Sequence, residues 1–249
     1  MNNQSLRKKP YLVLTRPEPG LSETAYKVSA LGWQPLLMPV MTIQPLTVDY
    51  LDVSAIQAIV FTSRQAIAPT IQQLAKQHID YRCFPVFTVG DITAQDAQKA
   101  GFTNILSANK DAVALAALIK DKLSSDAGQL LFPFAKGQGQ LLYALLKQAG
   151  FSALQYEVYQ AIPVQTLSDE FLDKLQSETI NSILFFSSET ARFFIELLPE
   201  HLWKYLKTIQ AVGISQKTKG VLERVSWKRI DIARHPNTEE MLFLLKEHF

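Results

Sequence analysis

The chain has 249 residues, of which 47% are hydrophobic and 19% are charged, and its formal net charge is +2. This composition is typical of a globular protein with one or two domains, and the small charge gives no indication of a nucleic-acid-binding surface. A single cysteine, Cys83, excludes an intrachain disulfide and a CxxC site, and its apolar neighbours predict that it is buried.

The N-terminal residues are polar and then basic, and no apolar segment follows them. We therefore expect no signal peptide and, since no apolar run approaches membrane-spanning length, no membrane segment. The expected location is the cytoplasm. The four histidines show no metal-ligand spacing, so we expect no metal.

Short apolar segments alternate with helical patterns through the first half of the chain. An apolar run at 12–15 and a turn-rich loop precede a helix predicted over 21–31, where a glycine follows as the stop signal. The segment 36–46, interrupted by two prolines, is predicted to be extended. Further strands, each followed by a loop and a helix, are predicted at 58–61, 86–89, 104–106 and 130–132. The last of these ends in a predicted loop over 133–139.

The segment 154–163 is the most strand-like part of the sequence. It alternates bulky and polar residues, is rich in β-branched and aromatic residues, and ends in a proline. It lies where one set of strand–helix units stops and another begins, so Tyr159 is placed to face a ligand held between two lobes. The alternative is that Tyr159 only packs against a neighbour, as many half-buried strand tyrosines do.

The rest of the chain continues the alternation. Strands are predicted at 183–186, 209–212 and 230–233, and helices at 168–175, 190–198 and 199–206 and after each of the last two strands. Short apolar strands that alternate with helices indicate an α/β fold with doubly wound parallel sheets covered on both faces.

Three landmarks recur at nearly constant separation. They are Gly32 and Gly150, 118 residues apart, Ser63 and Ser188, 125 apart, and Gly90 and Gly213, 123 apart. Four strand–helix units therefore occur twice in the same order. The repeat by itself places a boundary near Gly128. The two proline-marked stretches, 39–46 and 154–163, look instead like a pair of connectors between two lobes.

The loops that follow the predicted strands are small and hydroxylic. In an open parallel sheet these loops form the ligand-binding edge, and hydroxyl and N–H groups at helix starts bind anions. Cations stand in several of them, namely Arg16, Arg64, Lys110, Lys136, Lys217 and Arg234. Each hydroxyl taken singly is explained as a helix N-cap. Taken together, they suit a ligand with several carboxylates.

Other chemistries find little support in the sequence. No GxGxxG motif follows a predicted strand, and no P-loop motif is present, so neither a dinucleotide nor a P-loop nucleotide is indicated. No GxSxG elbow and no Ser–His–Asp set can be identified.

Several short motifs, in this order and spacing, resemble the uroporphyrinogen-III synthase family along essentially the whole chain. They are Leu14-Thr15-Arg16-Pro17, Met38-Pro39 with Ile43, Phe61-Thr62-Ser63 with Ala66, Val89-Gly90 with Thr93-Ala94, the Gly150 helix stop, Val158-Tyr159, Phe186-Ser187-Ser188 and Val212-Gly213. The resemblance implies two flavodoxin-like α/β domains joined by a two-stranded connector, with the active site between them. The implied bounds are 1–38 with 164–249 for the first domain, 46–154 for the second, and 39–45 and 155–163 for the connecting strands.

The resemblance also implies an activity. The substrate would be hydroxymethylbilane, a linear tetrapyrrole with eight carboxylates, which is closed into uroporphyrinogen III with loss of water and inversion of ring D. No cofactor or metal is implied. Tyr159 would donate a proton to the departing hydroxyl. The implied substrate-binding residues are Thr15, Arg16, Ser63, Thr93, Lys136, Ser188, Ser215 and Gln216.

Three places depart from the family pattern. Gln216, with Ser215 beside it, stands where a threonine is usual, and Lys136 and Gln140 stand where an arginine is common. Lys219 and Gly220 stand where the helix usually has alanines. We expect a monomer, with the upstream hydroxymethylbilane synthase as a candidate partner. The alternative function is that of a non-catalytic, two-lobed protein that binds a small polyanion.

Overall fold

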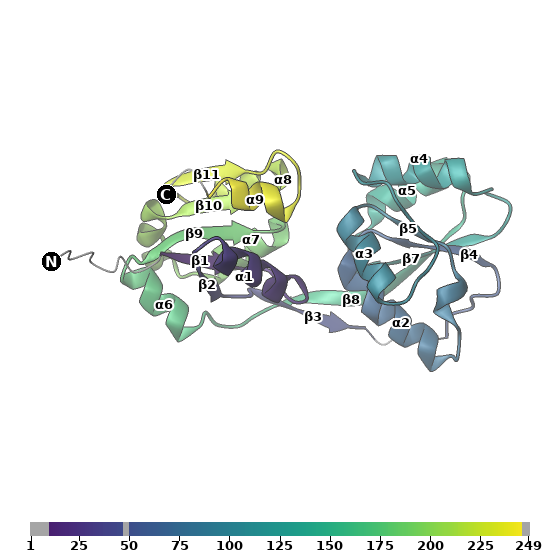
Figure 1. Cartoon of the computed structure of the whole chain (residues 1–249), viewed down its shortest axis with the longest axis horizontal. Coiled ribbons are helices and arrows are strands. Elements are labelled where there is room, and N and C mark those ends of the chain that lie inside the picture. The colour runs from purple at the N-terminus through teal and green to yellow at the C-terminus, as the bar shows by residue number, and fades with distance from the viewer. Residues whose placement is uncertain (1–9, 47–49, 246–249) are drawn as a thin grey trace. The chain divides into compact units, whose positions relative to one another are not determined.

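The computed structural model describes residues 10–46 and 50–245, and it confirms the α/β fold with parallel sheets (Figure 1). The described chain divides into two compact units. We call Ile43–Ala161 the inserted unit, and the described residues on either side of it the discontinuous unit.

The discontinuous unit contains a parallel sheet with the strand order β11-β10-β9-β1-β2. Its strands are β1 (Tyr11–Leu14), β2 (Gln34–Leu37), β9 (Ile180–Phe185), β10 (Gln210–Gly213) and β11 (Arg229–Ile232). Its helices are α1 (Gly20–Ala30), α6 (Asp169–Gln176), α7 (Ser188–Leu197), the 3-10 helix η3 (Glu200–Thr208), α8 (Gln216–Leu222) and α9 (Thr238–Phe243).

Successive side chains of a strand point to opposite sides of the sheet, so an apolar strand presents apolar side chains on both faces. In this sheet both faces are covered. On one face, Leu12 and Leu184 pack with Val28 of α1 and Met241 of α9. On the other face, the rings of Phe171, Phe185, Phe194 and Trp227 pack edge to face or tilted against one another. The apolar runs of the sequence are therefore strands buried on both sides, as expected of a parallel sheet.

The inserted unit is built around a sheet with the strand order β3-β8-β7-β4-β5-β6. Its strands are β3 (Met41–Pro45), β4 (Ile56–Phe61), β5 (Val86–Thr88), β6 (Ile105–Ser107), β7 (Gln129–Ala135) and β8 (Ala153–Pro163). Its helices are η1 (Arg64–Ala66), α2 (Ile67–Lys76), η2 (Tyr81–Cys83), α3 (Asp91–Lys99), α4 (Ala112–Lys122) and α5 (Gln140–Gln148). Leu74 of α2 packs on the face of Phe61, and Leu115 of α4 on the opposite face with Val60.

Strands β3 and β8 both pass from one unit to the other. The Val164 N–H donates to the Val40 carbonyl at 3.1 Å, and the Leu46 N–H donates to the Val158 carbonyl at 2.9 Å. Because the partner number falls as the residue number rises, β3 runs antiparallel to β8, whereas β8 runs parallel to β7. These two strands form the two-stranded connector expected from the sequence.

The two sheets have the same spatial strand order once the sequence repeat is applied. The repeat pairs β1 with β7, β2 with β8, β9 with β4 and β10 with β5, and the order then pairs β11 with β6. Each sheet combines two of these strands from one repeat with three from the other, and β3 is added at the edge of the six-stranded sheet, beside β8. The boundary near Gly128 that the repeat suggests would separate β4 from β7, which are hydrogen-bonded neighbours in one sheet.

Strand β7 is longer than predicted, because it continues through Pro133 to Ala135. The N–H groups of Leu130 and Lys136 donate toward β8. Successive residues of a strand direct their N–H groups to opposite sides, so a donor at position 133 would point toward β4. The pairs between β7 and β4 end at Leu131. Proline is tolerated there because no ladder hydrogen bond is lost.

Cys83 is exposed, so the expectation that it is buried is wrong. Its thiol lies at the end of η2 and donates to the Asp80 carbonyl at 3.0 Å. The apolar neighbours Phe84 and Val86 predicted burial, but Cys83 ends a short 3-10 turn, whereas Phe84 follows that turn and Val86 begins the buried strand β5.

Candidate functional site

The strand order reverses next to β1 in the discontinuous unit and next to β4 in the inserted unit. From β1 the chain proceeds to β2 on one side, while β9, β10 and β11 lie on the other; from β4 it proceeds to β5 and β6, while β7 and β8 lie on the other side. In open parallel sheets, ligands bind outside the carboxyl ends of the strands at such points. The candidate residues are therefore those in the loops after β1 and β9, and after β4 and β7.

Thr15 directly follows β1 and is fully buried. Its hydroxyl donates to the Leu184 carbonyl of β9 at 2.7 Å. The hydroxyl thus joins the ends of the two strands that flank the reversal point, and its proton is committed to the backbone. This arrangement gives Thr15 a role in holding the loop that begins with Arg16.

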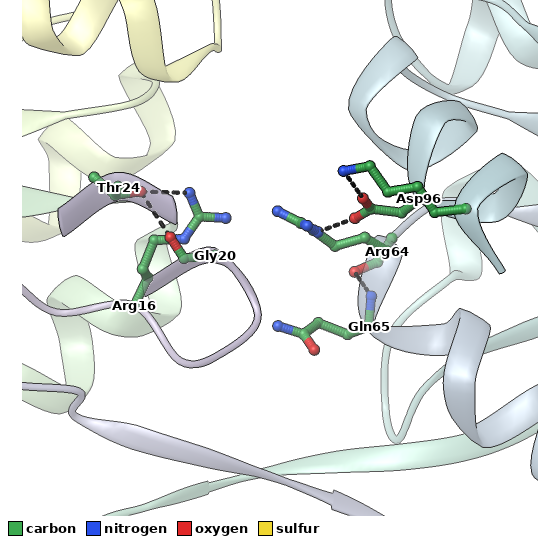
Figure 2. A network of polar contacts seen from close by, with 8 residues as sticks. Arg16, Gly20, Thr24, Arg64, Gln65 and Asp96 are labelled. Carbon is green, nitrogen blue, oxygen red and sulfur yellow. Dashed lines mark hydrogen bonds and ion pairs between the residues drawn. The ribbon is translucent and has the colours of Figure 1, made fainter. Parts of the chain in front are cut away.

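Arg16 lies in the loop after β1, and its side chain contacts the loop after β9. Its guanidinium carbon is 4.2 Å from the centroid of the Phe186 ring, and its Nη1 atom is 3.4 Å from Oγ1 of Thr24. The Thr24 hydroxyl in turn donates to the Gly20 carbonyl at 2.7 Å (Figure 2). A guanidinium that stacks on an aromatic ring is well suited to bind carboxylates.

The loop after β9 carries a capping box. Ser187 Oγ accepts from the Thr190 N–H at 3.0 Å, and Thr190 Oγ1 accepts from the Ser187 N–H at 3.2 Å. Ser188, which the sequence marked as a binding residue, is the first residue of α7 and is half-buried. Its hydroxyl is not the one that caps the helix.

The loop after β10 holds the remaining two candidates of this unit. Ser215 caps α8, since its Oγ accepts from the Thr218 N–H at 3.3 Å. Gln216 is the next residue and is exposed. Capping alone explains Ser215, as it does for most single hydroxyls at helix starts.

In the inserted unit, the loop after β4 places a largely buried ion pair beside an N-cap serine. Ser63 Oγ accepts from the Gln65 N–H at 3.3 Å, and the Arg64 guanidinium contacts the carboxylate of Asp96 on α3. The side chains of Arg64 and Asp96 are 10% and 16% exposed. Figure 2 shows the side chains of Arg64 and Gln65 extending in the same direction from η1.

Asp96 was missed by sequence reasoning. It lies in the middle of α3 and also contacts Lys99 one turn later, at 3.4 Å. A helical aspartate followed by a lysine is an ordinary surface pattern, so no local signal marks its pairing with Arg64, which is created by the packing of α3 against η1.

Thr93 and Lys136 follow β5 and β7. Thr93 lies in the first turn of α3 and is 9% exposed, and the N-cap residue of that helix is Gly90, which has no side chain to cap it. Lys136 is exposed, and its backbone N–H donates to the Tyr159 carbonyl at 2.8 Å. This bond ties the loop after β7 to the strand that carries Tyr159.

Tyr159 lies in β8 and is 6% exposed. It belongs to the core of the inserted unit, together with Phe61 and Tyr156. The register between β7 and β8 shifts here, so that Phe134 faces Glu157 and Ala135 faces Tyr159. The extra residue is in β8, and the two successive residues Val158 and Tyr159 are both buried. β-Bulges redirect side chains in this way and are frequent next to active sites.

The structure therefore groups the candidates unit by unit. Thr15, Arg16 and Ser188 gather where β1 adjoins β9, with Ser215 and Gln216 at the neighbouring strand end, and Ser63, Thr93, Lys136 and Tyr159 belong to the inserted unit. Within residues 10–46 and 50–245, no group of three or more His, Cys, Asp or Glu side chains is arranged to hold a metal ion. None of the helices described is both long and apolar enough to cross a membrane.

A separate groove lies between α1 and α9. It has a volume of about 550 Å³ and is lined by Tyr26, Lys27, Ala30, Leu31, Asn237, Glu239, Glu240, Leu242 and Phe243. None of the residues predicted to bind substrate lines it.

Comparison with known proteins gives one family and several similar structures. The model of the family described as uroporphyrinogen-III synthase HemD matches residues 22–242. The structure of uroporphyrinogen-III synthetase from Helicobacter pylori is 17% identical, with a TM-score of 0.63, over 96% of this chain and 99% of that one. A mutant uroporphyrinogen III synthase from Thermus thermophilus is 17% identical, with a TM-score of 0.58, over 96% of this chain and 98% of that one. No curated protein matches the sequence.

Proposed function

The chain belongs to the uroporphyrinogen-III synthase family, and on this premise we propose how its own residues serve the family's reaction. The activity is that of a cyclising lyase of tetrapyrrole biosynthesis, which converts hydroxymethylbilane to uroporphyrinogen III. The family match over 22–242 carries this conclusion and does not favour a non-catalytic polyanion-binding protein.

Cations, hydroxyls and N–H groups are the groups that bind carboxylates such as those of the substrate. We assign this task to the strand-end residues Arg16, Ser63, Thr93, Lys136, Ser188, Ser215 and Gln216. Thr15 acts with them by fixing the loop of Arg16, since its hydroxyl already donates to Leu184. The position of these residues at and beside the points where the strand order reverses supports the assignment.

Tyr159 is the proposed proton donor to the hydroxyl that leaves as water. A phenol is a weak acid at neutral pH, and a positioned acid contributes about 10²–10⁴-fold to a rate. The remainder of the catalysis lies in holding the linear tetrapyrrole so that ring D attacks through its substituted carbon. The bulge that turns Tyr159 inward and the bond from Lys136 to its carbonyl support a fixed position for this side chain.

The domain bounds 1–38 with 164–249 and 46–154, with 39–45 and 155–163 as connecting strands, remain part of the proposal. The division of the chain around Ile43–Ala161 supports them. We further propose a monomer that works in the cytoplasm and receives its substrate from hydroxymethylbilane synthase. Sedimentation velocity, with and without that enzyme, measures both the oligomeric state and the association.

The activity is tested by incubating the protein with hydroxymethylbilane and separating the product isomers. Hydroxymethylbilane without enzyme closes to the type I isomer, so a reaction without protein is the control. We expect type III product in excess of type I. A mixture that contains only the type I isomer would contradict the function.

A further inference from the structure

Gly20, the first residue of α1, leaves open the space that the Arg16 guanidinium occupies. A Cβ atom at this position would lie 2.3 Å from both Cζ and Nη2 of Arg16 and 2.4 Å from its Nε. Non-bonded carbon and nitrogen atoms cannot approach so closely, and optimal contacts between carbon atoms lie at about 3.5–4.0 Å. Any side chain at position 20 would therefore displace the guanidinium.

Two further contacts, with Phe186 and Thr24, hold the guanidinium in place, and we call this arrangement its seat. The Phe186 ring lies on one side at 4.2 Å, and Thr24 Oγ1 contacts Nη1 at 3.4 Å. Thr24 is held in turn by its bond to the Gly20 carbonyl (Figure 2). Phe186 comes from the loop after β9 and Thr24 from α1, so the seat is assembled from both sides of the reversal point.

No backbone requirement explains a glycine at position 20. Its φ angle is not among the positive values found at other glycines, such as Gly32 and Gly150. Within a helix, glycine is less favourable than alanine by up to about 1 kcal/mol. The space that the Arg16 guanidinium needs does explain a glycine at position 20.

We propose that Gly20 is a positioning residue, whose missing side chain keeps the Arg16 guanidinium seated against Phe186 and ready to bind a carboxylate of the tetrapyrrole. A guanidinium fixed before binding loses less conformational freedom when the carboxylate arrives, which favours binding. This inference rests on the proposed role of Arg16 and extends it to a residue that touches no substrate.

The test is a double-mutant cycle of Gly20→Ala and Arg16→Ala, assayed with hydroxymethylbilane. In Gly20→Ala, the long Arg16 side chain can take another rotamer and so avoid the new methyl group. Since alanine also favours the helix, the variant should fold with an unchanged or raised Tm. Its KM should rise about tenfold, the size of one lost charge-assisted hydrogen bond, while kcat changes little. In the Arg16→Ala background, Gly20→Ala should add no further change, because the group it displaces is already absent.

Gly220→Ala is the matched control. Gly220 lies within α8 of the same unit, and a Cβ atom there meets nothing within 4 Å, so its KM should equal that of the wild type.

Three results would overturn the role of Gly20 without touching that of Arg16. They are an unchanged KM in Gly20→Ala, an equal rise in KM with and without Arg16, and a strong fall in Tm, which would show that the glycine serves the packing of α1. An Arg16→Ala variant with wild-type KM would overturn the role of Arg16 and, with it, that of Gly20. Failure of the activity itself is separate, since it would appear as type I product from the wild type.

Discussion

Catalysis by Tyr159 would require its phenolic hydroxyl, whereas packing requires only its ring. Because its ring lies in the core of the inserted unit, Tyr159→Phe keeps the buried ring and removes the phenolic hydroxyl. We expect kcat to fall about 100-fold while product still binds. The measurement is the initial rate of uroporphyrinogen III formation, together with a product-binding titration.

Tyr156→Phe provides the control for this variant, since Tyr156 lies in the same strand and the same core. It should turn over like the wild type. Equal rates for Tyr159→Phe and Tyr156→Phe would remove Tyr159 as the acid and leave positioning of the substrate as the mechanism.

The Thr15 hydroxyl is expected to stabilise the fold around Arg16. Thr15→Val keeps the shape of the side chain but removes, in a fully buried setting, the hydroxyl that donates to the Leu184 carbonyl. Losing such a bond lowers the free energy of unfolding by about 1–3 kcal/mol. Urea unfolding measures this change.

Thr208→Val is the matched comparison, since the Thr208 hydroxyl also donates to a backbone carbonyl, that of Tyr205 at 2.9 Å, but at the surface. It should change the free energy of unfolding by less than about 0.5 kcal/mol. Equal losses for the two valine variants would show that burial of the Thr15 bond is not the reason for its effect.

Single residues were predicted where a local rule determines them. Ser63 and Ser215 follow strands and cap helices, as hydroxyls in such loops do. The rule failed to choose between Ser187 and Ser188, because both stand after a strand and only the start of the helix decides which one caps. Asp96 could not be found, since its partner Arg64 is distant in sequence and is brought to it by packing.

The pairing of α1 with α9 is expected to depend weakly on pH. Lys27 of α1 contacts Glu239 of α9 at 2.6 Å, and this hydrogen bond lowers the pKa of Glu239 below its ordinary value of 4.5. A lowered carboxyl pKa stabilises the fold above the ordinary value, and the stabilisation is lost as the pH falls through the lowered value. Since both side chains are largely exposed, the effect should stay below about 1 kcal/mol.

Urea unfolding of Glu239→Gln tests this expectation at two pH values. At pH 7 in low salt, the variant should be slightly less stable than the wild type, and the difference should shrink at pH 3 and in 1 M salt. A difference that is the same at both pH values would show that the charge of Glu239 does not cause it.

Helix ends were the most predictable feature at the level of elements. α1 and α5 end just before Gly32 and Gly150, whose φ angles are +89° and +87°, as the sequence rule for glycine stops requires. The end of β7 was not predictable in the same way. Pro133 is a local signal to stop a strand, whereas the strand continues because pairing with β8 needs no donor from it.

Each of the two sequence repeats contributes strands to both units. The five repeat-related strands have the same spatial order in both sheets, and β3 is an additional edge strand in one of them. Each sheet nevertheless draws strands from both repeats, so the repeat predicted the strand order but not which strands lie in one sheet. The connectors settled that question, because 39–46 and 154–163 carry prolines at the places where β3 and β8 pass between the units. Local strand signals could not decide it, since pairing between distant strands leaves no local trace.

This division predicts which fragment of the chain folds by itself. The fragment Ile43–Ala161 holds the parallel strands β4 to β8 with the helices that cover both faces of their sheet. We expect it to unfold cooperatively in urea, with a circular dichroism spectrum typical of an α/β protein. The reason is that a sheet with both faces covered buries its own core and does not depend on strands from elsewhere in the chain.

The fragment 1–127 is the informative comparison, because it is of similar length and contains one whole sequence repeat. It has β4 without its neighbour β7, and β1 without its neighbour β9, so each of its sheets is broken at the centre. Such a fragment exposes strand edges and half of each core, and we expect non-cooperative unfolding and aggregation. Cooperative unfolding of 1–127 but not of 43–161 would show that the repeat, and not the spatial unit, is what folds.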